Sequence, residues 1–184
     1  RILLAQHMKR LSDAELVNRI MQYLERFPGD GRMHAMVRNG FVACTEEKQI
    51  ALVQLVRDRL QVFSEFVELT EFIFTEPACS PDLLRWKTMT GGDVALSLQA
   101  TLARLEELAE GLFEKNAIDA LLKKRAEEAG DNGSVFWPLR VALTGRKASP
   151  PPAPIMEILG KEKTLLRLTA AIGMLKNIDT KQAA

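Results

Sequence analysis

Residues 12–27 read SDAELVNRIMQYLERF, and this stretch predicts an α-helix with a defined start. Ser12 followed by Glu15 is the pattern of a capping box, in which each side chain accepts a hydrogen bond from a free backbone N–H of the first turn. Apolar residues follow at the spacing of one helix face: Leu16, Ile20, Tyr23, Leu24 and Phe27. Pro28-Gly29-Asp30-Gly31 then ends the predicted helix.

Residues typical of helix starts and ends also occur along the rest of the chain. Thr45 precedes two glutamates, which favours a helix start, and Pro81 suits the first turn of a helix that starts at Ser80. The remaining predicted helices cover 45–60, 63–74, 94–112, 116–129, 135–144, 155–159 and 164–176. No segment alternates as a strand does. We therefore expect an all-α protein of two packed helical subdomains, residues 1–78 and 79–184.

Composition limits the class of protein. The chain has 184 residues, 47% hydrophobic and 27% charged, which suits a folded protein. No apolar run approaches the roughly 20 residues of a membrane helix, and the start, Arg1 and three apolar residues, does not resemble a secretory signal. Two cysteines and two histidines predict no disulfide framework and no zinc site. We expect a cytoplasmic protein with no membrane contact.

The net charge of +1 is unevenly distributed. Residues 1–60 hold 10 Lys and Arg against 7 Asp and Glu, residues 61–134 hold 7 against 14, and residues 135–184 hold 8 against 3. A basic end on a near-neutral chain indicates a local contact with a polyanion. Charge also varies along chains that bind no polyanion, so both interpretations stay open here.

Signatures of catalysis are lacking. Neither His7 nor His34 belongs to a known nucleophile pattern, and Gly91-Gly92 lacks the lysine and spacing of a phosphate-binding loop. We expect this chain to hold no catalytic residue, no cofactor and no metal, and to be inactive as an enzyme by itself.

The most informative stretch is 134–168. Arg140 projects from the apolar run SVFWPLRVALTG of residues 134–145. The basic, proline-stiffened loop RKASPPPAP of residues 146–154 follows, and LGKEKTLLRL covers 159–168. A stiff loop loses little entropy on binding and can present flat rings to unstacked bases. A plain surface linker with a solvated arginine is the alternative.

FWPLRVALTG, followed by SPP and LGKE, resembles the C-terminal anticodon-binding region of bacterial-type glutamyl-tRNA synthetases, which are class I glutamate–tRNA ligases. QHMKRLSDAEL of residues 6–16 and VQLVRDRLQVFSEFVELTEFIFTE of residues 53–76 also resemble segments of that family. The resemblance implies an all-α anticodon-binding helix cage, with tRNA(Glu) as partner and a monomeric state. It also implies a parent enzyme whose catalytic domain uses ATP and Mg; the signatures of that domain are missing, so the chain looks like a piece of a longer synthetase.

The resemblance also implies which residues read the anticodon. Arg140 matches an arginine that contacts the first anticodon base. Ser149 and Pro150 match a Thr-Pro pair that accommodates the anticodon, and Pro152 matches an apolar residue beside it, although this chain has prolines at 151 and 152 where the family has glycine and leucine. Arg59 matches the position that senses the third base.

The chemistry of Arg59 can be argued separately. Cytosine offers O2 and N3 as acceptors, and an arginine has only donors. Guanine presents N–H donors on the same edge, so Arg59 should favour an anticodon that ends in C over one that ends in G. A surface ion pair with Asp58 or another acid is the alternative for Arg59. Arg57 faces elsewhere on the helix, and we expect of it a phosphate contact at most.

Basic side chains near the loop are candidate phosphate contacts, which would set affinity rather than base choice. They are Lys147, Lys161, Lys163 and Arg167. Two other functions remain open: a helical protein-interaction module that docks through its acidic middle, and a helical RNA-binding module with no synthetase role.

Overall fold

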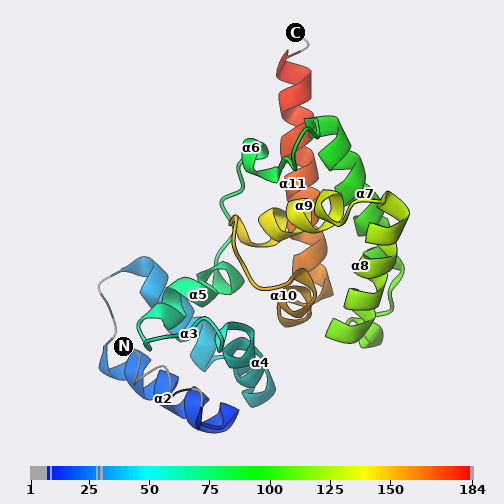
Figure 1. Cartoon of the computed structure of the whole chain (residues 1–184). Helices are drawn as coiled ribbons and strands as arrows, with labels where there is room; N and C mark the ends of the chain where they lie inside the picture. The colour runs from blue at the N-terminus through cyan, green and yellow to red at the C-terminus, as the bar shows by residue number, and fades with distance from the viewer. Residues whose placement is uncertain (1–7, 9, 28, 30, 183–184) are drawn as a thin grey trace. The chain divides into compact units, whose positions relative to one another are not determined.

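The computed structural model describes residues 8, 10–27, 29 and 31–182, with side chains described as far as Lys176 (Figure 1). Over these residues the chain is helical and contains no strand, which confirms the all-α prediction. The helices divide into two compact units, Arg1–Glu76 and Pro77–Ala184. This division lies two residues before the expected one at 78.

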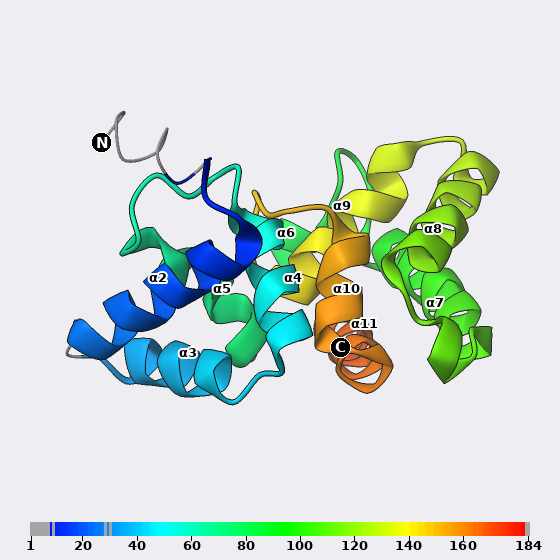
Figure 2. The ribbon, with the colours of Figure 1, turned by 90° about the horizontal axis from the view of Figure 1, so that it is seen from below.

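Unit 1 contains α2 (Asp13–Arg26), α3 (Arg32–Val42), α4 (Glu46–Val56) and α5 (Glu65–Phe74). The capping box of Ser12 and Glu15 is present as predicted, and the Thr45 side chain accepts a hydrogen bond from Lys48 N at the start of α4. Helix α2 contacts α3 and α4, and Figure 2 shows the three helices together. Both predicted caps are therefore in use.

The sequence analysis did not predict α3. Its start, Gly31, offers no side-chain cap, and Gly40 lies within its last turn. Gly40 is there because α3 packs closely on α5: a Cβ at residue 40 would lie 2.3 Å from Cδ1 of Phe74. Tertiary packing, rather than local preference, selects this helix.

Aromatic rings fill the core of unit 1. Phe41 of α3 and Phe66 of α5 are fully buried, with their ring centroids 4.8 Å apart at an edge-to-face angle of 67°. Leu16, Ile20 and Leu24 of α2 are also completely buried. The apolar stripe that the sequence predicts for α2 is thus its core face.

Unit 2 contains α6 (Pro81–Leu84), α7 (Gly91–Glu107), a 3₁₀ turn (Glu110–Leu112), α8 (Lys115–Ala129), α9 (Asn132–Thr144), α10 (Pro152–Leu159) and α11 (Lys161–Gln182). Helix α7 packs along α11, and α9 contacts α6, α7, α8, α10 and α11 (Figure 1). Seven α9 residues are buried: Val135, Pro138, Leu139, Val141, Ala142, Leu143 and Thr144. The stretch that carries FWPLRVALTG is therefore the central element of its unit.

Several helix boundaries in unit 2 differ from those predicted. Helix α10 starts at Pro152 rather than at Ile155, because the first positions of a helix need no N–H and tolerate Pro152 and Pro154. Helix α7 starts at Gly91 rather than at Val94, because Thr90 and Asp93 form a capping box at its start, and it ends at Glu107 rather than at Leu112, where Leu108 turns to an extended backbone. No helix in the described part of the chain is long and apolar enough to span a membrane.

We predict opposite effects for two helical glycines. Gly40→Ala should lower the free energy of unfolding by about 1–3 kcal/mol, because the new methyl group overpacks Phe74. Gly173→Ala in α11 meets nothing within 4 Å and should raise it by up to about 1 kcal/mol through helix propensity. Thermal unfolding followed by circular dichroism measures both. A Gly40→Ala variant as stable as Gly173→Ala would contradict the close packing of α3 on α5.

Candidate nucleic-acid interface

The start of α9 is fixed by its N-cap. Asp131 accepts hydrogen bonds from Gly133 N at 3.0 Å and from Trp86 Nε1 at 2.9 Å, and these bonds lower the pKa of its carboxyl group. The Trp86 ring fills the space over Gly133, where a Cβ would come within 2.1 Å of the indole. The segment 86–87 is thereby attached to the first turn of α9.

Pro138 interrupts the hydrogen bonding inside α9 without ending the helix. A proline has no N–H, so the carbonyl of Ser134 loses its usual helical partner. The Ser97 hydroxyl of α7 donates to that carbonyl at 2.8 Å. A side chain from a neighbouring helix therefore replaces the missing bond.

The end of α9 is held by backbone and side-chain donors. Gly145 closes the helix at φ 68° and donates to Val141 O at 2.7 Å; a Cβ there would lie 2.9 Å from Ala78 O. The Cys79 thiol also donates to Val141 O, at 3.2 Å, and burial raises the pKa of this thiol, which keeps it protonated. The Thr144 hydroxyl donates to Arg140 O at 2.7 Å.

Arg167 completes this helix end from α11. Its side chain is 5% exposed, and Nη1 donates to Leu143 O at 2.7 Å. A phosphate contact by Arg167 does not fit this burial. Arg167 lies in a basic stretch of the sequence, but its position on α11 directs its side chain into the core.

Arg140 lies on the last turns of this fixed helix. It is half-buried, and its Nε is a buried donor with no hydrogen-bond partner among the described residues. No carboxylate in the described part of the chain forms an ion pair with Arg140. Uncompensated donors are rare in folded proteins; His34 Nδ1 and Arg125 Nε are also buried without a hydrogen-bond partner among the described residues.

The loop between α9 and α10 exposes only part of its predicted site. Ser149, Pro150 and Pro152 are buried; Ser149 is 4% exposed, and its hydroxyl donates to Pro150 O at 3.0 Å. Lys147 and Pro151 are exposed. The three predicted loop residues thus set the path of the loop in this structure, and a base contact by the Ser149 hydroxyl would require the loop to shift.

A hollow of about 510 Å³ opens beside this loop. It is lined by Ser80, Asp82, Leu83, Arg85, Trp137 and Lys147. The Trp137 indole N–H donates to Leu83 O at 2.8 Å, which fixes the ring. Trp137 and Arg140 are three residues apart on α9 and therefore share a helix face.

The sequence analysis missed this hollow. The mixture of basic and aromatic residues in Arg85-Trp86-Lys87 was the available signal, because such mixtures are common on surfaces that bind single-stranded nucleic acid. Asp82 and Arg85 form an exposed ion pair at 3.7 Å across its wall.

Arg59 belongs to unit 1, where it is exposed on the turn that follows α4. Its backbone N–H donates to Val56 O at 2.9 Å. The Arg57 guanidinium donates to Asp13 and to Leu11 O. The expected phosphate contact by Arg57 does not fit this arrangement.

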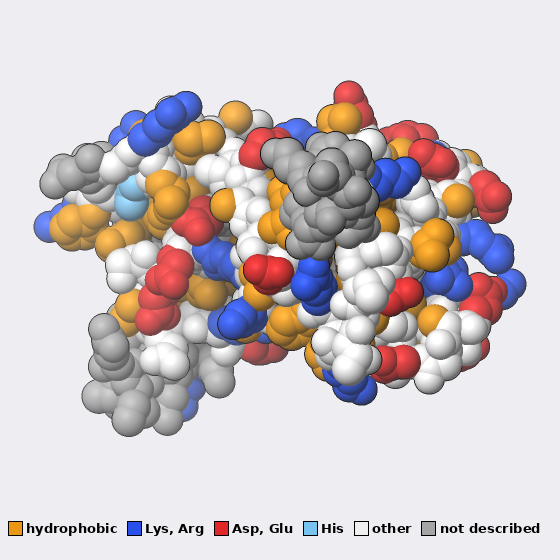
Figure 3. Space-filling view, turned by 90° about the horizontal axis from the view of Figure 1, so that it is seen from above, with side chains coloured by type: hydrophobic (Ala, Val, Ile, Leu, Met, Phe, Trp, Pro, Cys, Tyr) orange, Lys and Arg blue, Asp and Glu red, His pale blue; other side chains and the backbone are white. Residues whose placement is uncertain are grey.

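The remaining basic candidates differ in their surroundings. Lys161 Nζ donates to Glu106 O at 2.8 Å and to Leu108 O at 2.6 Å, so it caps the end of α7. Lys163 is exposed. Figure 3 shows basic and acidic side chains interspersed on the face that it presents, so the charge blocks of the sequence do not form a single-sign surface there. No group of three His, Cys, Asp or Glu residues that could hold a metal occurs among the described residues.

A helix cage with a half-buried arginine next to a basic loop is an arrangement suited to single-stranded nucleic acid. The family model of the anticodon-binding domain matches residues 8–172. The chain therefore belongs to the anticodon-binding domain family, as the resemblance in its motifs indicated.

Relatives of known name extend this result. The chain is 33% identical over 174 residues to the glutamate–tRNA ligase of Saccharopolyspora erythraea, covering 91% of this chain and 32% of the relative, and 31% identical over 176 residues to that of Dehalococcoides mccartyi, covering 95% and 34%. Among solved structures, a glutamate tRNA ligase from Elizabethkingia meningosepticum shares the fold, with a TM-score of 0.73 at 21% identity; the match covers 94% of this chain and 31% of that one. The chain spans about a third of the length of each.

We predict that Ser97 compensates for Pro138. Ser97→Ala should lower the free energy of unfolding by about 1 kcal/mol, because it leaves the half-buried Ser134 carbonyl without its donor. In a Pro138→Ala background, residue 138 regains an N–H. There, Ser97→Ala should lower the free energy of unfolding by much less. Chemical denaturation of the two single variants and the double variant measures this coupling. An equal loss of unfolding free energy in both backgrounds would show that the Ser97 hydroxyl does not replace the helical hydrogen bond that Pro138 cannot donate.

Proposed function

We propose that this chain recognises the anticodon of tRNA(Glu) as the anticodon-binding part of a glutamate–tRNA ligase. The family match over residues 8–172 carries the proposal, and the names of the relatives support the choice of ligase. The attachment of glutamate, which uses ATP and Mg, would be performed by the part of such a ligase that this chain does not span. We further propose that the chain acts in the cytoplasm and as a monomer.

In unit 2 the proposed base contact is made by Arg140. An unstacked base carries acceptors on its pairing edge, and Arg140 has a donor without a partner. Because α9 is held at its start, middle and end, the guanidinium is placed before the RNA arrives, which reduces the entropy lost on binding. The hollow beside Trp137 has room for a nucleotide, with Arg85 and Lys147 at its edge to attract the phosphate.

In unit 1 the proposed reader of the third anticodon base is Arg59. Its exposed guanidinium can donate to O2 and N3 of cytosine, and it would face donors on guanine. This difference favours tRNA(Glu) over a tRNA whose anticodon ends in G, such as a tRNA for glutamine. Lys147 and Lys163, both exposed, are the proposed phosphate contacts; Ser149, Pro150 and Pro152 shape the loop between α9 and α10.

We predict that Arg140→Ala weakens binding of a tRNA(Glu) anticodon stem-loop by about 5- to 150-fold, which corresponds to about 1–3 kcal/mol for a lost base contact. The thermal midpoint should stay close to that of the unaltered chain, because the Arg140 guanidinium forms no ion pair with the described residues and its Nε has no hydrogen bond to lose. Lys124→Ala, at an exposed cation on α8, is the matched control and should bind normally. Fluorescence anisotropy with a labelled stem-loop measures the affinities.

Other outcomes of that titration would support the rival functions. Equal affinity for any stem-loop, with a steep salt dependence, would indicate a non-specific RNA-binding module. No RNA binding at low salt would favour a protein-interaction module. An Arg140→Ala variant with unaltered affinity would remove Arg140 from the site.

We predict that Arg59→Gln reduces discrimination at the third anticodon position. The unaltered chain should prefer a stem-loop with C at this position over the same RNA with G by about 5- to 100-fold. Glutamine has both a donor and an acceptor in its amide group, so it can pair with either base and should bring the ratio towards one. Competition titrations with the two RNAs measure the ratio, and a ratio left unchanged by the substitution would contradict the role of Arg59.

A further inference from the structure

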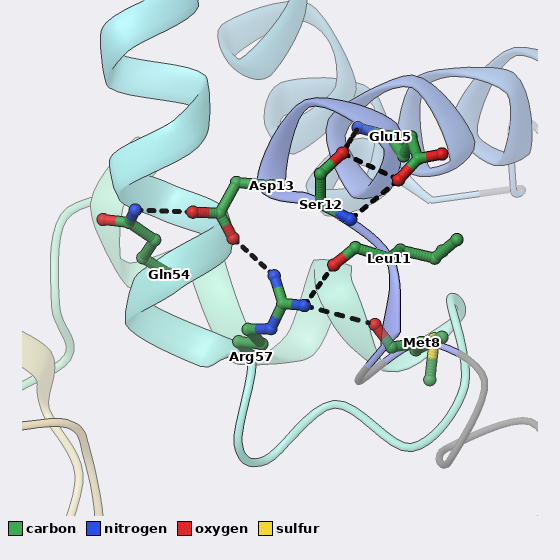
Figure 4. A network of polar contacts seen from close by, with 7 residues as sticks. All are labelled: Met8, Leu11, Ser12, Asp13, Glu15, Gln54 and Arg57. Atoms are coloured by element: carbon green, nitrogen blue, oxygen red, sulfur yellow. Dashed lines mark hydrogen bonds and ion pairs between the residues drawn. The ribbon is translucent and has the colours of Figure 1, made fainter.

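Arg57 forms the densest set of polar contacts in unit 1 (Figure 4). Its side chain is 23% exposed and lies at the C-cap of α4. One guanidinium nitrogen, Nη1, donates to the Asp13 carboxylate; the other, Nη2, donates to Leu11 O and reaches Met8 O at 3.5 Å. An arginine that donates to three acceptors, one of them a carboxylate, is a structural clamp rather than a surface charge.

All three acceptors come from the start of α2 and the residues before it. That segment is itself held by the capping box, in which Ser12 N donates to Glu15 Oε2 at 2.8 Å. Gln54, one turn before Arg57 on α4, donates to the other oxygen of Asp13 at 2.6 Å. The Gln54 and Arg57 side chains therefore attach the end of α4 to the start of α2, and Arg57 is the later of the two along the chain.

The residue proposed to read the third base comes directly after this clamp. The turn that contains Arg59 is closed by two hydrogen bonds to Val56 O, from Arg59 N at 2.9 Å and from Leu60 N at 3.0 Å. Leu60 is 3% exposed and anchors the turn on its far side. The backbone of Arg59 is thus held between the Arg57 clamp and a buried leucine.

We infer that Arg57 is a positioning residue for Arg59, and that it sets the discrimination between C and G at the third anticodon position without touching RNA. This inference rests on the proposed function of Arg59. A donor fork discriminates between bases only when its position is fixed, because a mobile guanidinium can move away from the donors of guanine and bind a phosphate instead. Loss of the clamp should therefore reduce discrimination more than affinity.

The test compares the ratio of dissociation constants for two anticodon stem-loops that differ only in C or G at the third position. Arg57→Ala should lower this ratio by about 2- to 30-fold, the range for residues that act on a site without contacting its ligand. Arg57→Lys keeps a charge for Asp13 but loses the fork, so it should give an intermediate ratio. Gln54→Ala removes the other bond to Asp13 and leaves the Arg57 clamp in place, so this matched control should keep the original ratio.

A double-variant cycle separates positioning from stability. If Arg57 acts through Arg59, Arg57→Ala should have no further effect on the ratio in an Arg59→Gln background. A purely structural role would lower the affinities for both RNAs by the same factor and leave the ratio intact, which would overturn the inference. An effect of Arg57→Ala that persists in the Arg59→Gln background would also overturn it. Should Arg57→Ala fail to fold by circular dichroism, Arg57→Lys and Asp13→Asn provide the same comparison.

Failure of the Arg59 role and failure of the Arg57 role give different results. An unchanged ratio in Arg59→Gln contradicts the proposed role of Arg59, whatever Arg57 does. A changed ratio in Arg59→Gln together with an unchanged ratio in Arg57→Ala contradicts the positioning role alone.

Discussion

The hydrogen bonds at the carboxyl end of α9 are the constraint on which the unit 2 site depends. The last carbonyls of a helix have no partners within the helix, and a buried end must find donors elsewhere. Here Gly145 N, the Cys79 thiol and the Arg167 guanidinium supply them. A helix end held in this way fixes the backbone of Arg140 and the first residues of the loop that follows.

In both units, an arginine that faces inward donates the hydrogen bonds that hold a helix end. Arg167 holds the end of α9, and Arg57 holds the end of α4. Arg59 lies two residues after Arg57, and Arg140 lies on α9, the helix whose end Arg167 holds. Each unit thus holds one arginine that positions the backbone and one that is proposed to contact RNA, and charge alone does not distinguish the two kinds.

The sequence was sufficient to predict most of the fold, because capping residues and glycines mark the helix ends. The capping box at Ser12 and the cap at Thr45 are where the sequence indicates them, and the predicted helices 116–129 and 135–144 end at residues 129 and 144, before left-handed glycines. Helix α3 was missed because nothing local marks its start. The start of α10 was misplaced because a run of prolines also suits a loop.

Site residues were harder to predict because their exposure depends on tertiary packing. Arg167 and Lys163 lie in one basic stretch, yet one is buried and the other is exposed. Ser149 is a polar residue in a proline-rich loop, and the structure buries it. The hollow beside Trp137 joins residues of α6, α9 and the loop, and no local sequence pattern brings these elements together.

The most direct test of the central claim follows the Arg140 Nε–H signal by ¹⁵N nuclear magnetic resonance, assigned with an Arg140→Lys variant. Adding a tRNA(Glu) anticodon stem-loop should shift this signal, because a base bound to the Arg140 guanidinium changes the surroundings of Nε. The same stem with a scrambled loop should leave the signal in place. An Nε–H signal that does not shift when the anticodon stem-loop is added, or that shifts equally with both RNAs, would contradict anticodon recognition by this arginine.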